Sequence, residues 1–110
     1  MQIYYQADDT PSWVCGHWNN SPLAIGMGKR TTVGSEQYHY HPYCEYYIGL
    51  EGEATLKVED EYLTLRRQMI IMIEPGERHQ IVAISPSGAQ WIVIQEQSRP
   101  QTKYIVNAPV

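Results

Sequence analysis

Hydrophobic residues occur along this chain in short runs that turn residues interrupt. Glycine and proline recur at short intervals, and the segments between them are rich in Tyr, Ile, Val and Thr. No long segment repeats its apolar residues with the 3.6-residue period of an amphipathic helix. Because β-branched and aromatic residues between turns are typical of strands, the pattern predicts an all-β protein.

The predicted strands cover residues 24–30, 37–41, 45–50, 53–59, 61–65, 69–73, 79–83 and 90–95. Short strands in this number, separated by turns, are typical of a sandwich or a barrel. We expect a single domain over residues 1–110, with an irregular arm at 1–22, the barrel at 23–97 and a tail at 98–110 that holds one further edge strand at 103–106. The arm carries Trp13 and Trp18, which we expect to cover a barrel edge or a neighbouring subunit.

Composition and charge limit the kinds of partner that we expect for this protein. The net charge of −4 and the scattered basic residues provide no basic stripe that could follow a phosphate backbone, so we expect no nucleic acid partner. The longest apolar run, Met69 to Ile73, is far shorter than the roughly 20 residues that cross a bilayer. The first residues show no secretory leader, so we expect a cytoplasmic protein with Cys15 and Cys44 reduced.

Three histidines and one glutamate have the spacing of a metal site. His39 and His41 lie two apart on a predicted strand, so both imidazoles point to the same face. Glu45 follows after a short turn, and His79 follows the Pro75-Gly76 turn. Neutral imidazoles and a carboxylate suit a divalent transition metal such as Mn, Fe, Ni or Zn, with positions left open for water or substrate.

Strand alternation places Gln37 and Tyr47 on the same face as these predicted ligands. We expect both side chains to bind substrate, and Tyr47 is the candidate catalytic residue, for proton transfer or for substrate orientation. A core tyrosine with a satisfied hydroxyl is an equally good interpretation of Tyr47. Further pocket residues could come from less certain strand positions, namely Met27, Arg30, Met72, Ile81, Trp91 and Val93.

Two segments resemble the motifs of the cupin superfamily. The pattern His39-x-His41-x3-Glu45-x6-Gly52 resembles its first motif, and Pro75-Gly76-x2-His79 resembles its second. The resemblance covers roughly residues 23–97 and implies a double-stranded β-helix, or jelly-roll barrel, with a metal site. The second motif departs from the family pattern at positions that bind no metal, namely Gln68, Glu74 and Ala83. These departures leave the substrate open.

Three functions fit this resemblance. The first is a metal-dependent enzyme that acts on a small oxygen-rich molecule such as a sugar, a uronate or a hydroxy or keto acid. Its chemistry would be that of an isomerase or epimerase, or of a dioxygenase if the metal is iron. The second is a non-catalytic module that binds or senses such a molecule, and the third is a barrel whose metal site is residual. In each case the outward apolar residues Ile48 and Leu50 and the aromatic arm predict a homodimer.

Overall fold

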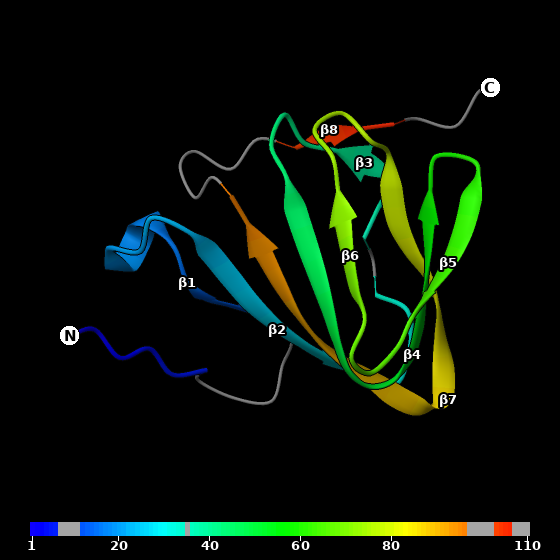
Figure 1. Ribbon diagram of the computed structural model, residues 1–110, viewed down its shortest axis with the longest axis horizontal. Helices are drawn as coiled ribbons and strands as arrows, with labels where there is room; N and C mark the ends of the chain where they lie inside the picture. Colours follow the sequence, from blue (N-terminus) through cyan, green and yellow to red (C-terminus); the bar gives the residue numbers. More distant parts are fainter. Residues whose placement is uncertain (7–11, 35, 97–102, 107–110) are drawn as a thin grey trace.

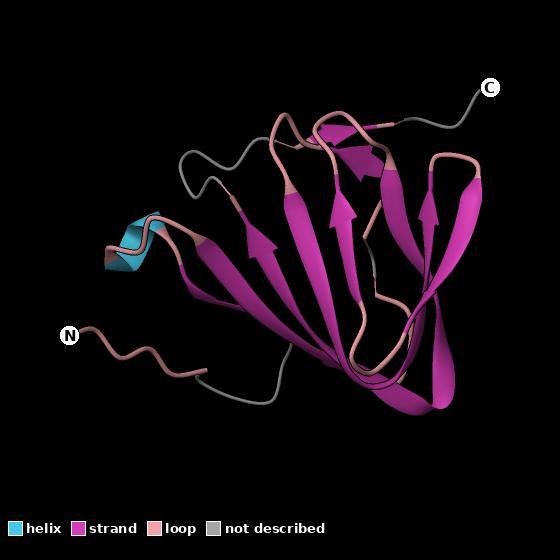
Figure 2. Cartoon of the chain, viewed as in Figure 1, coloured by secondary structure: helices cyan, strands magenta, loops and turns pink. Residues whose placement is uncertain are grey.

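The computed structural model describes residues 1–6, 12–34, 36–96 and 103–106 of the chain. Strands make up nearly all of the regular structure in these residues, and a single turn of 3-10 helix, η1 (His17–Asn19), is the exception (Figure 2). The strands are β1 (Ser12–Cys15), β2 (Ala24–Arg30), β3 (His39–Tyr40), β4 (Glu45–Val58), β5 (Glu61–Leu65), β6 (Ile70–Ile73), β7 (His79–Gln95) and β8 (Tyr104–Ile105). The all-β prediction is confirmed.

The strands form a single antiparallel sheet that curls around an interior (Figure 1). Its order is β1-β2-β7-β3-β8, and β4 pairs with β5, β6 and β7. The long strands β4 and β7 lie antiparallel over their whole length, from the pair Glu45–Gln95 to the pair Val58–His79. The end of β7 also pairs with β2 and its beginning with β3, so β7 joins the two halves of the curl.

The predicted strands at 24–30 and 61–65 have the observed bounds, whereas two predicted strand pairs are each one long, bent strand. Residues 45–50 and 53–58 fall within β4, which ends one residue before the predicted bound at 59, and 79–83 and 90–95 fall within β7. The register of the β4–β7 pair shifts on both sides of Gly52, whose φ of 64° bends β4 without ending it. Gly52 therefore marks a bend within one strand and not a turn between two strands.

The prediction of an irregular arm at 1–22 is wrong for Ser12–Cys15. These residues form β1, which pairs with β2 and extends the sheet at its edge. The physical reason is the unpaired edge of β2, whose backbone groups gain hydrogen-bond partners when a further strand is added. Within the described residues, the predicted tail strand at 103–106 is present as β8, beside β3.

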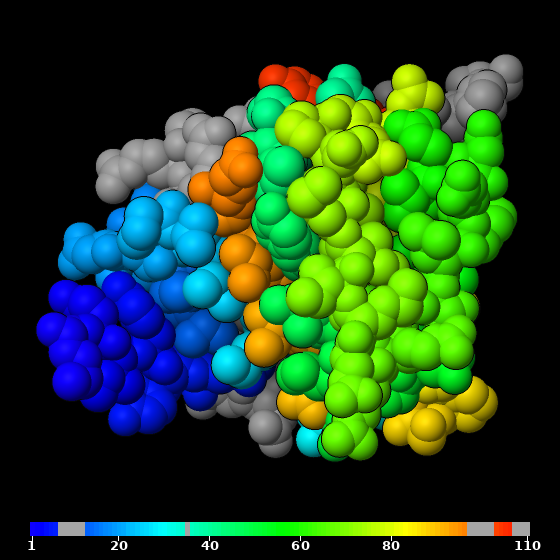
Figure 3. All heavy atoms as spheres, in the orientation of Figure 1, coloured from blue at the N-terminus to red at the C-terminus, as the bar shows by residue number. Residues whose placement is uncertain are grey.

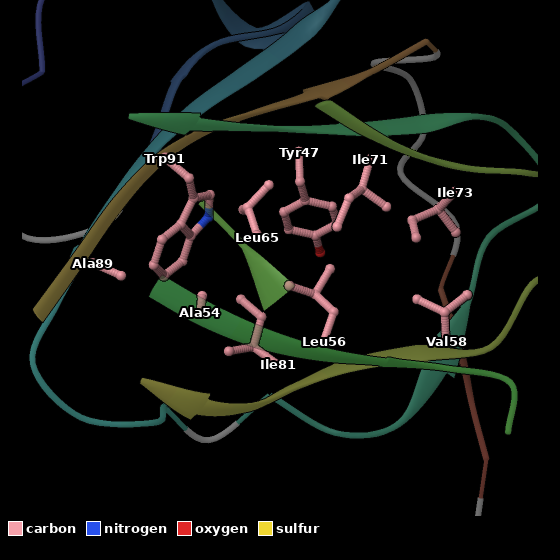
Figure 4. Packing of buried hydrophobic residues seen from close by; sticks show 10 residues of the cluster. All are labelled: Tyr47, Ala54, Leu56, Val58, Leu65, Ile71, Ile73, Ile81, Ala89 and Trp91. Atoms are coloured by element: carbon pink, nitrogen blue, oxygen red, sulfur yellow. The ribbon is translucent and has the colours of Figure 1, made fainter. Parts of the chain in front are cut away.

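The hydrophobic core fills the interior of the curl (Figure 4). Alternate residues of β4 point inward, so Tyr47, Ala54, Leu56 and Val58 are buried while their neighbours face outward. Side chains from β5, β6 and β7 complete the cluster, namely Leu65, Ile71, Ile73, Ile81, Ala89 and Trp91. The core occupies one part of the interior and leaves the end near β3 to polar side chains.

Two smaller expectations concern the cysteines and the membrane. Cys15 and Cys44 are both free thiols, as predicted. Across the residues that the structure describes, no helix has the length and apolar character needed to cross a membrane.

Candidate metal centre

Three buried imidazoles meet at one end of the curled sheet. His39 lies in β3 directly opposite His79, the first residue of β7, and His41 follows β3. One candidate ligand atom from each ring lies within 4.8 Å of the others. The ring centroids are 4.3 Å apart for His39 and His79, 4.8 Å for His39 and His41, and 5.4 Å for His41 and His79. The spacing of the histidines in the sequence therefore becomes proximity in space.

Backbone carbonyl groups fix the tautomer of two of these rings. His39 Nδ1 donates to the carbonyl of Gln37, and His79 Nδ1 donates to the carbonyl of Glu77 at 2.9 Å. A carbonyl can only accept a hydrogen bond, so each ring carries a proton on Nδ1, and Nε2 is the nitrogen that would bind a metal once it carries no proton of its own. Metal-binding histidines are oriented by such a bond on the nitrogen that faces away from the metal.

Glu45, the first residue of β4, lies against two of the imidazoles. Its Oε1 is 3.1 Å from His79 Nε2, and its Oε2 is 3.5 Å from His41 Nε2. Gln95 donates a hydrogen bond to Oε2, and the hydroxyl of Tyr43 donates to the Gln95 amide oxygen at 3.2 Å. Gln95 was missed in the sequence. The signal that could have found it is its inward alternation with Trp91 and Val93 along β7.

The environment sets the protonation of the candidate ligands. Burial raises the pKa of Glu45, but the hydrogen bond from His79 and the nearby imidazoles outweigh this and lower it to about 2. Burial lowers the pKa of His39 to about 4. Burial also lowers the pKa of His79, yet the Glu45 carboxylate outweighs it and the net change is upward. At neutral pH, Glu45 is therefore an anionic carboxylate and His39 is a neutral imidazole, which are the forms that bind a metal ion.

This donor set fits a divalent transition metal. Imidazole nitrogen and carboxylate oxygen are ligands that such ions share, and His39, His41, His79 and Glu45 would hold the ion. The backbone bonds to His39 and His79, together with the amide bond to Glu45, are the outer contacts that orient ligands in metal sites.

Three of the four candidate ligands, His39, His41 and Glu45, line a cavity of about 230 Å³ inside the curl. Its other walls come mainly from β2, β4 and β7, and include both apolar and charged side chains. The residues that line it besides the candidate ligands are Trp13, Gly26, Met27, Gly28, Arg30, Glu36, Tyr43, Tyr47, Ile81, Trp91, Val93, Gln95 and Lys103. Met72, which the sequence suggested as a further pocket residue, does not line this cavity.

Comparison with known proteins places this chain in a family. Residues 31–95 match the model of a family described as a cupin domain. The chain belongs to the cupin family. The resemblance found in its two motifs is thereby confirmed, and none of the curated proteins matches the sequence.

Solved structures share the cupin fold at low sequence identity. A cupin protein from Bacteroides fragilis is 19% identical, covers 100% of this chain and 98% of its own, and superimposes with a TM-score of 0.69. An RmlC-like cupin with a double-stranded β-helix fold from Methanocaldococcus jannaschii is 15% identical, with coverages of 89% and 92% and a TM-score of 0.68. The predicted double-stranded β-helix is confirmed by this likeness.

A third similar structure is oxalate decarboxylase from Bacillus subtilis, a protein described with Mn(II) centres. It is 16% identical, and the matched region is 79% of this chain but only 25% of that one, with a TM-score of 0.65. At such identities these likenesses show the fold alone.

Tyr47 lies inside this cupin barrel between the core and the candidate metal centre. Its side chain is buried and lines the cavity, and its ring stands edge-on to the His79 ring at 6.3 Å between centroids. Burial raises the pKa of Tyr47 well above its usual value of 10, and the Glu45 carboxylate, to which the phenol hydrogen-bonds, adds to this effect. The hydroxyl therefore stays protonated and acts as a donor.

Gln37 is placed differently from Tyr47. Its side chain is exposed and does not line the cavity, and its contact with the centre is the backbone carbonyl that accepts from His39. The expectation for Gln37 assumed strand alternation from residue 37, but β3 begins at His39. The loop before β3 instead directs the Glu36 side chain into the cavity, where its Oε1 is 3.7 Å from His39 Nδ1.

Proposed function

We propose that this cupin binds one divalent transition metal ion, of the class Mn, Fe, Ni or Zn, through His39, His41, His79 and Glu45. The observation that carries the proposal is the convergence of three buried imidazoles, two of which present Nε2 inward because a backbone carbonyl holds Nδ1. Polar rings gathered at this density inside a protein are stabilised when a ligand shared by all of them completes their interactions.

We further propose that the protein is a metal-dependent enzyme that acts on a small oxygen-rich molecule, with isomerase- or epimerase-like proton transfer. The cavity of about 230 Å³ is below the usual range for drug-sized ligands, so it suits a molecule of a few carbons. The bound ion would supply Lewis acidity that polarises a carbonyl or hydroxyl oxygen.

Tyr47 is the proposed proton donor of this reaction. Its hydroxyl is protonated and lines the cavity, and its hydrogen bond to the Glu45 carboxylate orients it; after transfer to the bound molecule, the proton would be restored from that molecule or from water. Replacement by phenylalanine removes the hydroxyl and keeps the ring in the core. We expect Tyr47→Phe to retain its metal and to lose at least about tenfold in rate, within the range typical for a general acid.

Proton exchange with solvent tests the proposed chemistry. Metal-loaded protein in D₂O is incubated with dihydroxyacetone, glucuronate or pyruvate, and deuterium at carbon is followed by NMR. We expect metal-dependent incorporation with at least one probe, and slower incorporation with Tyr47→Phe. Calorimetric binding of a probe without any exchange would contradict the enzyme proposal and support a non-catalytic binding module, the alternative function.

We also propose that the protein forms a homodimer through the outer face of β7, β4 and β6. The outward residues of these strands form two cross-strand rows, Ile94–Tyr46–Met72 and Ile92–Ile48–Ile70. Ile70 is 63% exposed and Met72 45% exposed. A second copy offers the same uncharged face, and a two-fold axis would pack the two faces as a sandwich. These strands lie side by side across the middle of Figure 3.

A further inference from the structure

Arg30 brings a positive charge into the cavity. It ends β2, where the alternate residues Ala24, Gly26 and Gly28 face the interior, and its half-buried side chain lines the cavity wall. Its guanidinium lies so close to Gly34 that a Cβ added at residue 34 would be 1.8 Å from Arg30 Nη1. Gly34 therefore leaves the space that the guanidinium occupies.

The guanidinium has unused donor capacity. Arg30 Nε is buried and has no hydrogen-bond partner among the described residues. A buried N–H of a charged group without a partner costs free energy, on the order of 1–3 kcal/mol or more. Oxygen atoms of a bound molecule would supply the missing acceptors. Among side chains, the planar fork of arginine is the best match to the two oxygens of a carboxylate.

The charges around the cavity also favour an anion. Arg30 and Lys103 bring two positive charges to its wall, and Glu36 and Glu45 bring two carboxylates. These contributions cancel, so a bound divalent ion leaves the cavity with an excess of positive charge. Within the part of the chain that the structure describes, Glu36 Oε1 is buried without a hydrogen-bond partner, which makes it an acceptor for a hydroxyl group on the same bound molecule.

We infer that Arg30 recognises a carboxylate and that the ligand of this site is a short carboxylic acid. The inference rests on the proposed metal site, since the other oxygen atoms of the acid would bind the ion, and it narrows the substrate class from sugars and acids to acids. Recognition takes place at the end of β2, while Lys103 at the cavity wall adds attraction for the anion.

Malonate and its neutral isostere malonamide test this inference, because they have the same carbon skeleton and differ in charge. Binding of each to metal-loaded protein is measured by calorimetry at fixed ionic strength, and the metal content of every sample is determined. We expect wild type to bind malonate at least about tenfold more tightly than malonamide. Arg30→Gln should reduce that preference to the part that the metal ion alone provides, and it should keep its metal.

Lys29→Gln is the matched control, because it removes the same charge from the neighbouring, exposed position of β2 and should behave as wild type. Gly34→Ala is an independent variant. The added methyl group displaces the flexible end of Arg30 and leaves the Arg30 side chain chemically intact, so the fold should survive and the preference should fall.

Equal binding of malonate and malonamide by wild type, or a preference that Arg30→Gln leaves unchanged, would overturn the inference. A wild-type protein without metal would contradict the proposed function separately. In that case the same two probes on the metal-free protein still decide the role of Arg30, because a preference for malonate that disappears in Arg30→Gln supports it and equal binding overturns it.

Discussion

At the scale of single residues, the centre depends on groups that hold its candidate ligands as well as on the ligands themselves. Glu45 is buried, and its Oε2 accepts a hydrogen bond from Gln95, which Tyr43 contacts in turn. Without that bond the carboxylate would keep its charge but could rotate away from His41 and His79. Orientation, and not charge alone, is what these partners provide.

Replacement of Gln95 by leucine should therefore weaken metal binding about 10- to 100-fold, as is typical for loss of an outer partner of a ligand. The dissociation constant is measured by competition with a chelator. Gln90→Leu is the control, because Gln90 lies on the same strand with its side chain on the opposite face from Trp91. Equal affinities for the two variants would show that Gln95 does not position Glu45.

Metal affinity should also fall as the pH is lowered, because an ion must displace the proton that His79 holds against Glu45. The pKa of His79 is raised, so this competition begins at a higher pH than for a free imidazole. His39, with its pKa lowered to about 4, should add no competition above that pH. Affinities measured by chelator competition between pH 8 and 5 check this, and a constant affinity would contradict it.

The candidate ligands could be found from the sequence because the alternation of a strand places His39 and His41 together whatever the rest of the chain does. Alternation along β7 could mark Gln95 as an inward residue but not as a partner of Glu45, and Glu36 could not be found this way. Gln95 reaches Glu45 only through the register of β4 with β7, and Glu36 enters the cavity only because β3 is shorter than predicted. The register between distant strands and the direction of a loop cannot be predicted from the local spacing of residues.

At the scale of elements, the length of β4 and β7 is what local reasoning missed. Glycine and polar residues near 50–53 and 84–90 are typical turn signals, and they divided each strand into two predicted pieces. In the sheet these positions are bends, where neighbouring strands satisfy the backbone groups across the register shifts. Pairing partners, which a local pattern does not contain, decide between a bend and a turn.

Gly52 at the bend of β4 should tolerate no side chain. It has a φ of 64°, and a Cβ there would be 1.9 Å from the carbonyl oxygen of Gly88 on β7. Gly52→Ala should lower the free energy of unfolding by more than the roughly 1–3 kcal/mol of an unfavourable φ, because a backbone clash is added. Urea denaturation of the metal-free protein measures this.

Gly76→Ala separates the two contributions. Gly76 also has a positive φ, of 83°, but a Cβ there meets nothing within 4 Å. In Gly76→Ala only the unfavourable φ should lower the free energy of unfolding, so this variant should be more stable than Gly52→Ala. If Gly52→Ala were equally stable, β4 and β7 would not approach each other as closely as described.

At the scale of the whole molecule, the cupin fold places the core and the polar centre at different parts of one curled sheet. β3 contributes His39, β4 contributes Glu45 and β7 contributes His79, so the centre joins two consecutive strands to a third that is distant in the sequence. The family, the fold class and the candidate ligands were within reach of the sequence because two short motifs carried them. The placement of Arg30 and Lys103 at the cavity wall could not be predicted from these motifs, because it depends on how the sheet curls.

The outer face of the sheet should hold two copies of the chain together. Ile70→Lys places a charge on the most exposed member of the apolar rows and should convert a dimer to a monomer, as measured by light scattering. Tyr62→Lys is the control, because Tyr62 is 66% exposed but lies on β5, outside the proposed interface. A wild-type monomer, or a dimer that Ile70→Lys leaves intact, would contradict the proposed interface.

The central claim is that this cupin holds one divalent transition metal ion among its three buried imidazoles and Glu45. Elemental analysis of protein purified without added metal tests it most directly, together with His41→Ala and Glu45→Ala, and with His17→Ala as a control on the partly exposed histidine outside the centre. We expect about one ion per chain in wild type and in His17→Ala, and a large loss in the other two. Wild type without metal, or His41→Ala with its metal retained, would contradict it.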